Sequence, residues 1–161
     1  MCDTVAVVGI GNILLRDEGV GVWVARALKK KPLAGNIRVI EGETAALDVF
    51  LSFPDTVKKV VIIDAVLGEG NPGTVYRIMP EDLASVQGVC VSLHQVGLFE
   101  TLEIAKRTGE PVPRMVIIGV EPKEIGWGMG VTPEIEKTFP EIIDTVLKEV
   151  ADDCDGKENP G

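Results

Sequence analysis

The chain has 161 residues, 45% of them hydrophobic, and 16 basic against 25 acidic side chains give it a formal net charge of −9. This length and apolar content suit one domain with a substantial core. The negative charge disfavours nucleic acid or an anionic membrane surface as the main partner. The first apolar stretch is preceded by Asp3 and by no basic residue, which is not the pattern of a signal peptide. No apolar run has membrane-spanning length, and we therefore expect a cytoplasmic protein.

Apolar runs bounded by turn residues predict four buried strands, at residues 4–8, 37–40, 60–63 and 115–120. Their apolarity is continuous rather than alternating, which is typical of strands that are covered on both faces. Residues 74–78 are expected to add a further strand at one edge of the sheet.

Helical periodicity separates these runs. It predicts one helix that follows the first strand and stops at Pro32, a second over residues 44–51, and a third after the short extended run that ends at His94. A last helix begins with Thr132 as its N-cap and is kinked or split at Pro140. The apolar face of this last helix is formed by Ile135, Phe139, Ile142, Ile143, Val146, Leu147 and Val150.

Alternating strands and helices are the signature of βαβ units. We therefore predict an α/β fold with three layers (α/β/α), in which helices cover both faces of a twisted, mostly parallel sheet of about five strands. Residues 1–150 are expected to form a single domain. Residues 151–161 are rich in Asp, Asn, Gly and Pro and are expected to form a flexible acidic tail.

The loop after the first strand differs from a dinucleotide-binding turn. Gly9 and Gly11 follow a buried strand as they would in such a turn, and they give the backbone access beyond the sheet. However, Leu14 stands where the third glycine belongs, and Asp17 and Glu18 place carboxylates where a phosphate needs free amides. The loop is better suited to a cation.

Three residues fall at the carboxyl ends of predicted strands, where open parallel sheets bind ligands. Glu18 lies in the first loop, Asp64 ends the most apolar strand, and His94, the one histidine, closes the extended run before the third helix. Two carboxylates and an imidazole suit a divalent metal such as nickel or zinc. Each residue also has an ordinary explanation: Asp64 in an Asx-turn, Glu18 at a helix dipole, and His94 as a hydrogen-bonded structural residue.

The cysteines indicate no disulfide framework. Cys2, Cys90 and Cys154 are odd in number and far apart, which predicts reduced thiols. Cys90 with His94 as a nucleophilic pair is disfavoured, because nothing nearby in the sequence would activate that thiol. The chain also has no Gly-x-Ser-x-Gly, His-Glu-x-x-His or phosphate-loop motif.

Several motifs occur in one order across nearly the whole chain: Gly9-Ile10-Gly11-Asn12-Ile13-Leu14, Asp17-Glu18-Gly19 with Gly21, Asp64-Ala65, Asn71-Pro72-Gly73-Thr74, His94-Gln95-Val96-Gly97-Leu98 and Gly119-Val120-Glu121-Pro122. As an ordered set, they resemble the hydrogenase maturation endopeptidases of nickel-iron hydrogenases. The resemblance implies a protease domain that removes a C-terminal extension from the precursor of the hydrogenase large subunit, after nickel loading, as the last maturation step.

The resemblance also implies roles for single residues. The family's metal-binding and catalytic Glu, Asp and His match Glu18, Asp64 and His94, and Asp17 is either a helper or a cap of the following helix. The nickel is expected to be carried by the substrate, although zinc or cadmium could occupy the site in crystals. The partner implied is the nickel-loaded precursor, and we expect the enzyme to act as a monomer.

One motif departs from the family. An Asp-Gly-Gly-Thr-like loop after the second strand, linked to substrate choice, reads Glu-Gly-Glu-Thr at residues 41–44. Glu43 replaces a glycine and would be tolerated poorly if the backbone had a positive φ there. The departure leaves open which hydrogenase subunit is the substrate. The residues expected to contact substrate are Gly11, Asn12, Glu41, Gly42 and Thr44.

Two alternatives come from other functional classes. The first is a metal-sensing chaperone or checkpoint protein that binds the same subunit without cutting it. The second is a nucleotide-binding module that uses Gly9 and Gly11, with Glu41 as the ribose acceptor; Leu14 and Glu18 argue against it.

Overall fold

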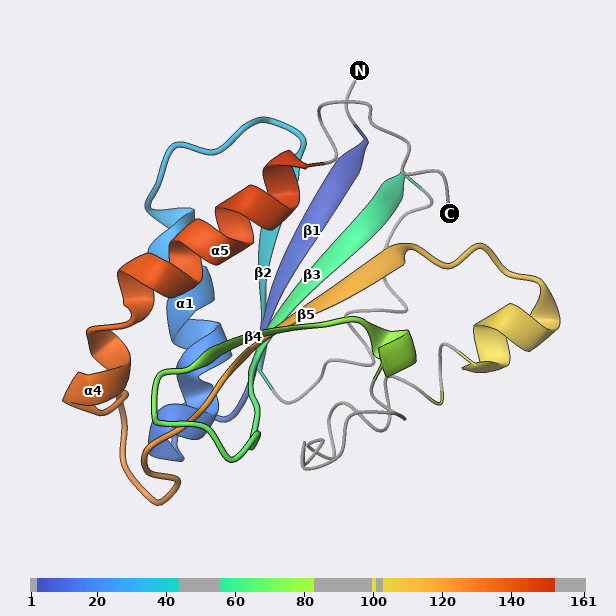
Figure 1. The fold of residues 1–161 in the computed structure, drawn as a ribbon. Coiled ribbons are helices and arrows are strands. Elements are labelled where there is room, and N and C mark those ends of the chain that lie inside the picture. Colours follow the sequence, from blue (N-terminus) through green and yellow to red (C-terminus); the bar gives the residue numbers. More distant parts are fainter. Residues whose placement is uncertain (1–2, 44–55, 83–99, 101–102, 153–161) are drawn as a thin grey trace.

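A computed structural model describes residues 3–43, 56–82, 100 and 103–152. Within these residues, five strands form one twisted sheet in the order β2-β1-β3-β5-β4 (Figure 1). Four strands are parallel, and β4 at one edge is antiparallel to β5. The strands are β1 (Thr4–Ile10), β2 (Ile37–Glu43), β3 (Val57–Ala65), β4 (Val75–Ile78) and β5 (Arg114–Val120). The predicted mostly parallel sheet and its edge strand are confirmed.

Both faces of the sheet are buried, which explains the continuous apolarity of its strands. Along β1, Val5 and Val7 belong to one core cluster, whereas Ala6 and Val8 belong to the other. Successive side chains of a strand point to opposite faces, so every position of β1 must be apolar when both faces are covered. The predicted α/β class follows directly from this pattern.

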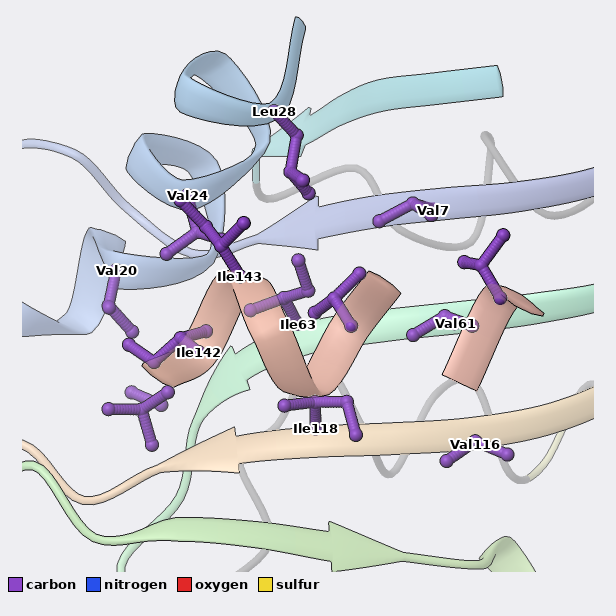
Figure 2. Packing of buried hydrophobic residues seen from close by; sticks show 14 of the residues in the cluster. Val7, Val20, Val24, Leu28, Val61, Ile63, Val116, Ile118, Ile142 and Ile143 are labelled. Atoms are coloured by element: carbon purple, nitrogen blue, oxygen red, sulfur yellow. The ribbon is translucent and has the colours of Figure 1, made fainter. Parts of the chain in front are cut away.

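Helices α1 and α5 cover the same face of the sheet, where their aliphatic side chains interlock with those of the central strands (Figure 2). Val24 of α1 and Ile142 of α5 are fully buried there. The described helices are η1 (Arg16–Gly19), α1 (Val20–Lys29), η2 (Pro80–Asp82), α4 (Pro133–Glu136) and α5 (Phe139–Ala151). No helix in these ranges is long and apolar enough to cross a bilayer.

The predicted interruption of the last helix is confirmed. Helix α4 ends at Glu136 and α5 starts at Phe139, with Pro140 in its first turn, where a missing N–H costs nothing. Helix α5 runs to Ala151, one residue past the predicted end of the domain. The predicted tail from residue 153 onward lies outside the described residues.

Other predicted features also lie outside the described residues. They are the helix at 44–51, the extended run ending at His94, and the three cysteines. Residues 103–108 are helical, as expected for the end of the third helix.

The second strand is longer than predicted. Glu41, Gly42 and Glu43 were expected in a loop, but they belong to β2, because β1 continues to Ile10 and pairs with them. Glu41 pairs with Gly9 and Glu43 with Ile10, and the register shifts between these two pairs. Among described non-glycine residues, only Arg16 and Glu69 have a positive φ. Glu43 belongs to an extended strand, so the condition under which it would be tolerated poorly, a positive φ, is not met.

An ionic cluster with a buried centre joins β3 and β4 to α5. Lys59 of β3 is 2% exposed, and its Nζ donates to the backbone oxygen of Glu149 at 2.8 Å and lies 3.1 Å from Oε1. Arg77 of β4 donates to both carboxylate oxygens of Glu149, at 2.7 and 2.9 Å. The hydrogen bond from Arg77, assisted by Lys59, holds the pKa of Glu149 below its ordinary 4.5.

Replacing Glu149 with Gln should destabilise the fold by about 3 kcal/mol, because it leaves the buried Lys59 ammonium without its carboxylate. Urea denaturation at pH 7 measures the loss. Glu141→Gln, at an exposed position of the same helix, is the control and should change stability by less than about 0.5 kcal/mol. Equal effects of both substitutions would contradict a stabilising role for the cluster.

The same cluster predicts a pH dependence. A carboxylate with a lowered folded-state pKa stabilises the protein fully above its unfolded pKa, and the contribution is lost as the pH falls through the folded value. Between pH about 5 and about 3, the wild type should therefore lose more stability than Glu149→Gln. Parallel stability curves for the two proteins over this range would contradict the assignment.

Candidate functional site

The carboxyl ends of the neighbouring strands β1 and β3 lie side by side, at the end of the sheet where the parallel strands finish. Gly9 pairs with Ile63, and the chain leaves β1 through η1, which packs against β3. Strand β1 has β2 on one side and β3 on the other, so the strand order reverses here. Open parallel sheets bind ligands in the crevice outside such a switch point.

Close backbone contacts seat the start of α1 over these strand ends. A Cβ on Gly21 would lie 2.0 Å from the carbonyl oxygen of Ile63, and one on Gly9 would lie 2.1 Å from that of Gly21. Gly11 has a φ of +139°, and a Cβ there would meet the Glu18 carbonyl oxygen at 2.1 Å. The chain's own backbone therefore fills the side-chain space at these glycines.

Glu18 is held by the turn that precedes it. The backbone N–H of Asn12 donates to Glu18 Oε2 at 2.9 Å, while Asn12 Oδ1 accepts from the N–H of Leu14 at 3.0 Å. Glu18 is half-buried, within η1 and just ahead of α1. The Asn12 turn thus fixes the direction of the carboxylate.

Asp64 lies in the buried end of β3, one residue before the strand ends, and is 1% exposed. Its Oδ1 accepts the N–H of Ala65 at 2.8 Å. The Asx-turn explanation is wrong, because the N–H of Val66 donates instead to the carbonyl of Val120. Asp64 is placed by its strand, in register with Gly119 of β5.

The described residues supply only part of the predicted metal site. Within them, no three His, Cys, Asp or Glu side chains gather in a way that could hold an ion. His94 and Thr44 lie outside the described residues. The joint ligation of a metal by Glu18, Asp64 and His94 stays a prediction.

Asp17 joins this loop to a distant one and does not cap α1, since the helix start has no side-chain cap. Fully buried, it accepts at Oδ2 from the N–H groups of Lys123 (3.0 Å) and Glu124 (2.9 Å). At Oδ1 it accepts from the N–H of Thr132 at 2.7 Å, and the Thr132 hydroxyl lies within bonding distance of both oxygens. Thr132 precedes α4 as predicted, but its hydroxyl binds Asp17 rather than capping that helix.

Glu121, just after β5, is a further buried carboxylate at this edge, and sequence reasoning assigned it no role. Its Oε2 accepts from the N–H of Gly68 at 2.6 Å and from the Tyr76 hydroxyl at 2.9 Å. Burial and the bond to Glu121 raise the pKa of Tyr76. Glu121 thus anchors the loop after β3, and a contact across 53 residues leaves no local signal in the sequence.

Glu41, a predicted substrate contact, is paired with two cations of α1. Arg26 Nε lies 3.0 Å from Oε2, and Lys29 Nζ lies 3.4 Å from Oε1. The hydrogen bond from Arg26 lowers the pKa of Glu41, and Lys29 adds to the effect. This pairing argues against Glu41 as a ribose acceptor.

Comparisons with known proteins decide the family. A model of the hydrogenase maturation protease family matches residues 22–149. This chain belongs to the hydrogenase maturation protease family. The match starts after Glu18 and spans the positions of Asp64 and His94.

Similar proteins agree with this membership and with the fold. The chain is 29% identical over 145 residues to the hydrogenase 2 maturation protease of Escherichia coli, covering 89% of this chain and 88% of that one. It is 29% identical to a putative hydrogenase maturation protease of Methanocaldococcus jannaschii, with 91% and 96% covered. The structure of the hydrogenase maturating endopeptidase HybD from E. coli superimposes with a TM-score of 0.80 at 28% identity, over 92% of this chain and 93% of that one. This family member is accordingly an endopeptidase, a hydrolase.

Asp17→Asn should destabilise the protein by roughly 3 kcal/mol, because the amide turns an N–H₂ group toward buried donors that need an acceptor. Urea denaturation measures the loss. Asp144→Asn, at an exposed position of α5, is the control and should have little effect. Wild-type stability combined with lost peptidase activity would instead make Asp17 a helper in the chemistry.

Proposed function

We propose that this protein removes the C-terminal extension of a nickel-iron hydrogenase large-subunit precursor after nickel has been loaded, as the last step of its maturation. Membership of the maturation protease family supports the reaction class. The observation that carries the proposal is the convergence of β1 and β3, which brings the Glu18 loop and Asp64 to one edge of the sheet. Their carboxylates and His94 form the proposed ligand set.

In this proposal the nickel ion belongs to the substrate. Sulfur ligands of the precursor would hold it, and Glu18, Asp64 and His94 would complete its coordination from the enzyme side. Imidazole is a suitable ligand for nickel. With only two carboxylates and one imidazole from the enzyme, coordination positions stay open for the substrate or a water molecule. Such shared coordination reports that loading is complete, because an empty precursor offers the three residues nothing to bind.

The chemistry is hydrolysis of one peptide bond. Glu18, Asp64 and His94 would hold the substrate's nickel ion, which would supply polarisation of the scissile carbonyl or the attacking water. Water adds to the carbonyl carbon, the C–N bond breaks, and the leaving nitrogen takes up a proton. The hydrogen bond from the N–H of Asn12 to Glu18 and the position of Asp64 in β3 support these roles.

The substrate chain is proposed to pass along the strand ends, in contact with five residues: Gly11, Asn12, Glu41, Gly42 and Thr44. Glu41 and Gly42 extend β2 on the far side of β1 from Asp64. The enzyme is proposed to work as a monomer in the cytoplasm.

Incubation with this protein should shorten a nickel-loaded precursor by its C-terminal peptide and leave a nickel-free precursor intact. Intact-mass spectrometry follows both. His94→Ala, Asp64→Asn and Glu18→Gln should each abolish processing, whereas Asp144→Asn should not. Circular dichroism and urea midpoints check that each variant is folded.

The outcomes separate the hypotheses. Unchanged mass with either form of several hydrogenase precursors would sink the proposal, and a stable complex without cleavage would favour the metal-sensing chaperone. Full activity of one variant would remove that residue from the mechanism. Equal cleavage of loaded and empty precursor would refute nickel dependence alone.

A further inference from the structure

Four exposed apolar side chains lie on two loops beside the candidate site. They are Leu14, 48% exposed, after β1, and Ile125 (49%), Trp127 (84%) and Met129 (62%) between β5 and α4. Single exposed apolar residues are ordinary, but a group of them on adjoining loops marks an interaction surface. Tryptophan is also the residue type most enriched in the energetic centres of protein interfaces. We call these four residues the apolar loop surface.

Backbone hydrogen bonds hold the two loops together. The N–H of Gly128 donates to the carbonyl of Leu14 at 2.9 Å, and the N–H of Arg16 donates to the carbonyl of Gly128 at 3.0 Å. These bonds bring Leu14 beside the Trp127–Met129 segment. Figure 1 shows the orange loop that leads into α4 lying next to the blue turn before α1.

The exposed side chains stand on a rigid base. The five donor contacts to Asp17 fix the loop at Lys123, Glu124 and Thr132. Gly128 packs so closely on Arg16 that a Cβ there would lie 2.4 Å from its Nε. A loop that is ordered before its partner arrives loses little entropy on binding.

The chemistry of this surface indicates an apolar partner. Lys123 and Glu134, which flank the loop, form an ion pair with each other. The exposed Glu124 adds one negative charge at the border of the surface, beside Ile125. Leu14 stands on the same loop as Glu18, so a protein bound at this surface would have a neighbouring segment at the strand ends. A standard interface covers about 800 Å² per partner, for which these four side chains would form the apolar centre.

We propose that the apolar loop surface docks the folded body of the precursor, with Trp127 filling an apolar pocket close to the base of the precursor's C-terminal extension. The inference rests on the proposed function and names the part of the enzyme that recognises the substrate's folded surface. Glu18, Asp64 and His94 would bind the metal ion, and the apolar loop surface would bind the protein surface around it.

The test is single-turnover cleavage of nickel-loaded precursor at increasing enzyme concentration. Trp127→Ala should raise the enzyme concentration that gives half the limiting rate by about tenfold or more and keep the limiting rate within about twofold. Met129→Ser should act in the same direction. Ile104→Ala is the control, because Ile104 is as exposed as Met129 at 62% but belongs to the yellow helix on the opposite side of the molecule (Figure 1).

Each other outcome overturns the inference. If the wild type cleaves and Trp127→Ala has an unchanged half-saturation concentration, docking at this surface is refuted while the proposed function stands. If the wild type neither cleaves nor binds any precursor, both fall. If analytical ultracentrifugation finds a wild-type dimer that Trp127→Ala dissociates, the surface belongs to a second copy of the chain. An unchanged urea midpoint shows that Trp127→Ala is folded, as its exposure predicts.

Discussion

The buried carboxylate of Asp17 is the contact on which the carboxyl-terminal edge of the sheet depends. It replaces water as the acceptor for backbone N–H groups of a loop more than a hundred residues further along the chain. Without an acceptor these donors would be buried unsatisfied, so the loop before α1 and the loop before α4 hold their places together. That single attachment fixes the base of Glu18 and also the base of Leu14 and Trp127. The proposed metal site and the proposed docking surface therefore share one framework.

The charged residues that stabilise the fold and those proposed to act on the substrate lie at different places on the sheet. Lys59 near the amino end of β3 and Glu149 of α5 form a buried ion pair, which the more exposed Arg77 of β4 extends. At the carboxyl ends, Glu18 lies in η1 after β1, and Asp64 is the second-last residue of the neighbouring strand β3. A buried charge is tolerated only when it is compensated. Lys59 and Arg77 compensate the Glu149 carboxylate within the protein, whereas Glu18 and Asp64 are the carboxylates proposed to bind the nickel ion of the substrate.

The sequence predicted those features of the fold that depend on residues close together in the chain. The apolar strands, the edge strand and the helix break at Pro140 follow from side-chain burial and from proline geometry, and all were expected from the sequence. Lys59 and Glu149 were left out of the predicted strand and apolar face because a charged residue reads as exposed until its partner is known. The extension of β2 through Glu43 depends on pairing with β1, and the contacts of Asp17 and Glu121 span long stretches of chain. Contacts between residues so far apart in the chain cannot be predicted from the local sequence around either one.

Glu18, Asp64 and His94 are proposed to converge on one metal ion at the strand ends. Crystals of the protein soaked in cadmium or nickel salts test it most directly, through the anomalous scattering of the ion. The account predicts one strong peak outside β1 and β3, within about 2.0–2.4 Å of a carboxylate oxygen of Glu18, one of Asp64 and a ring nitrogen of His94. An ion bound elsewhere, or bound at this edge without His94, would contradict it.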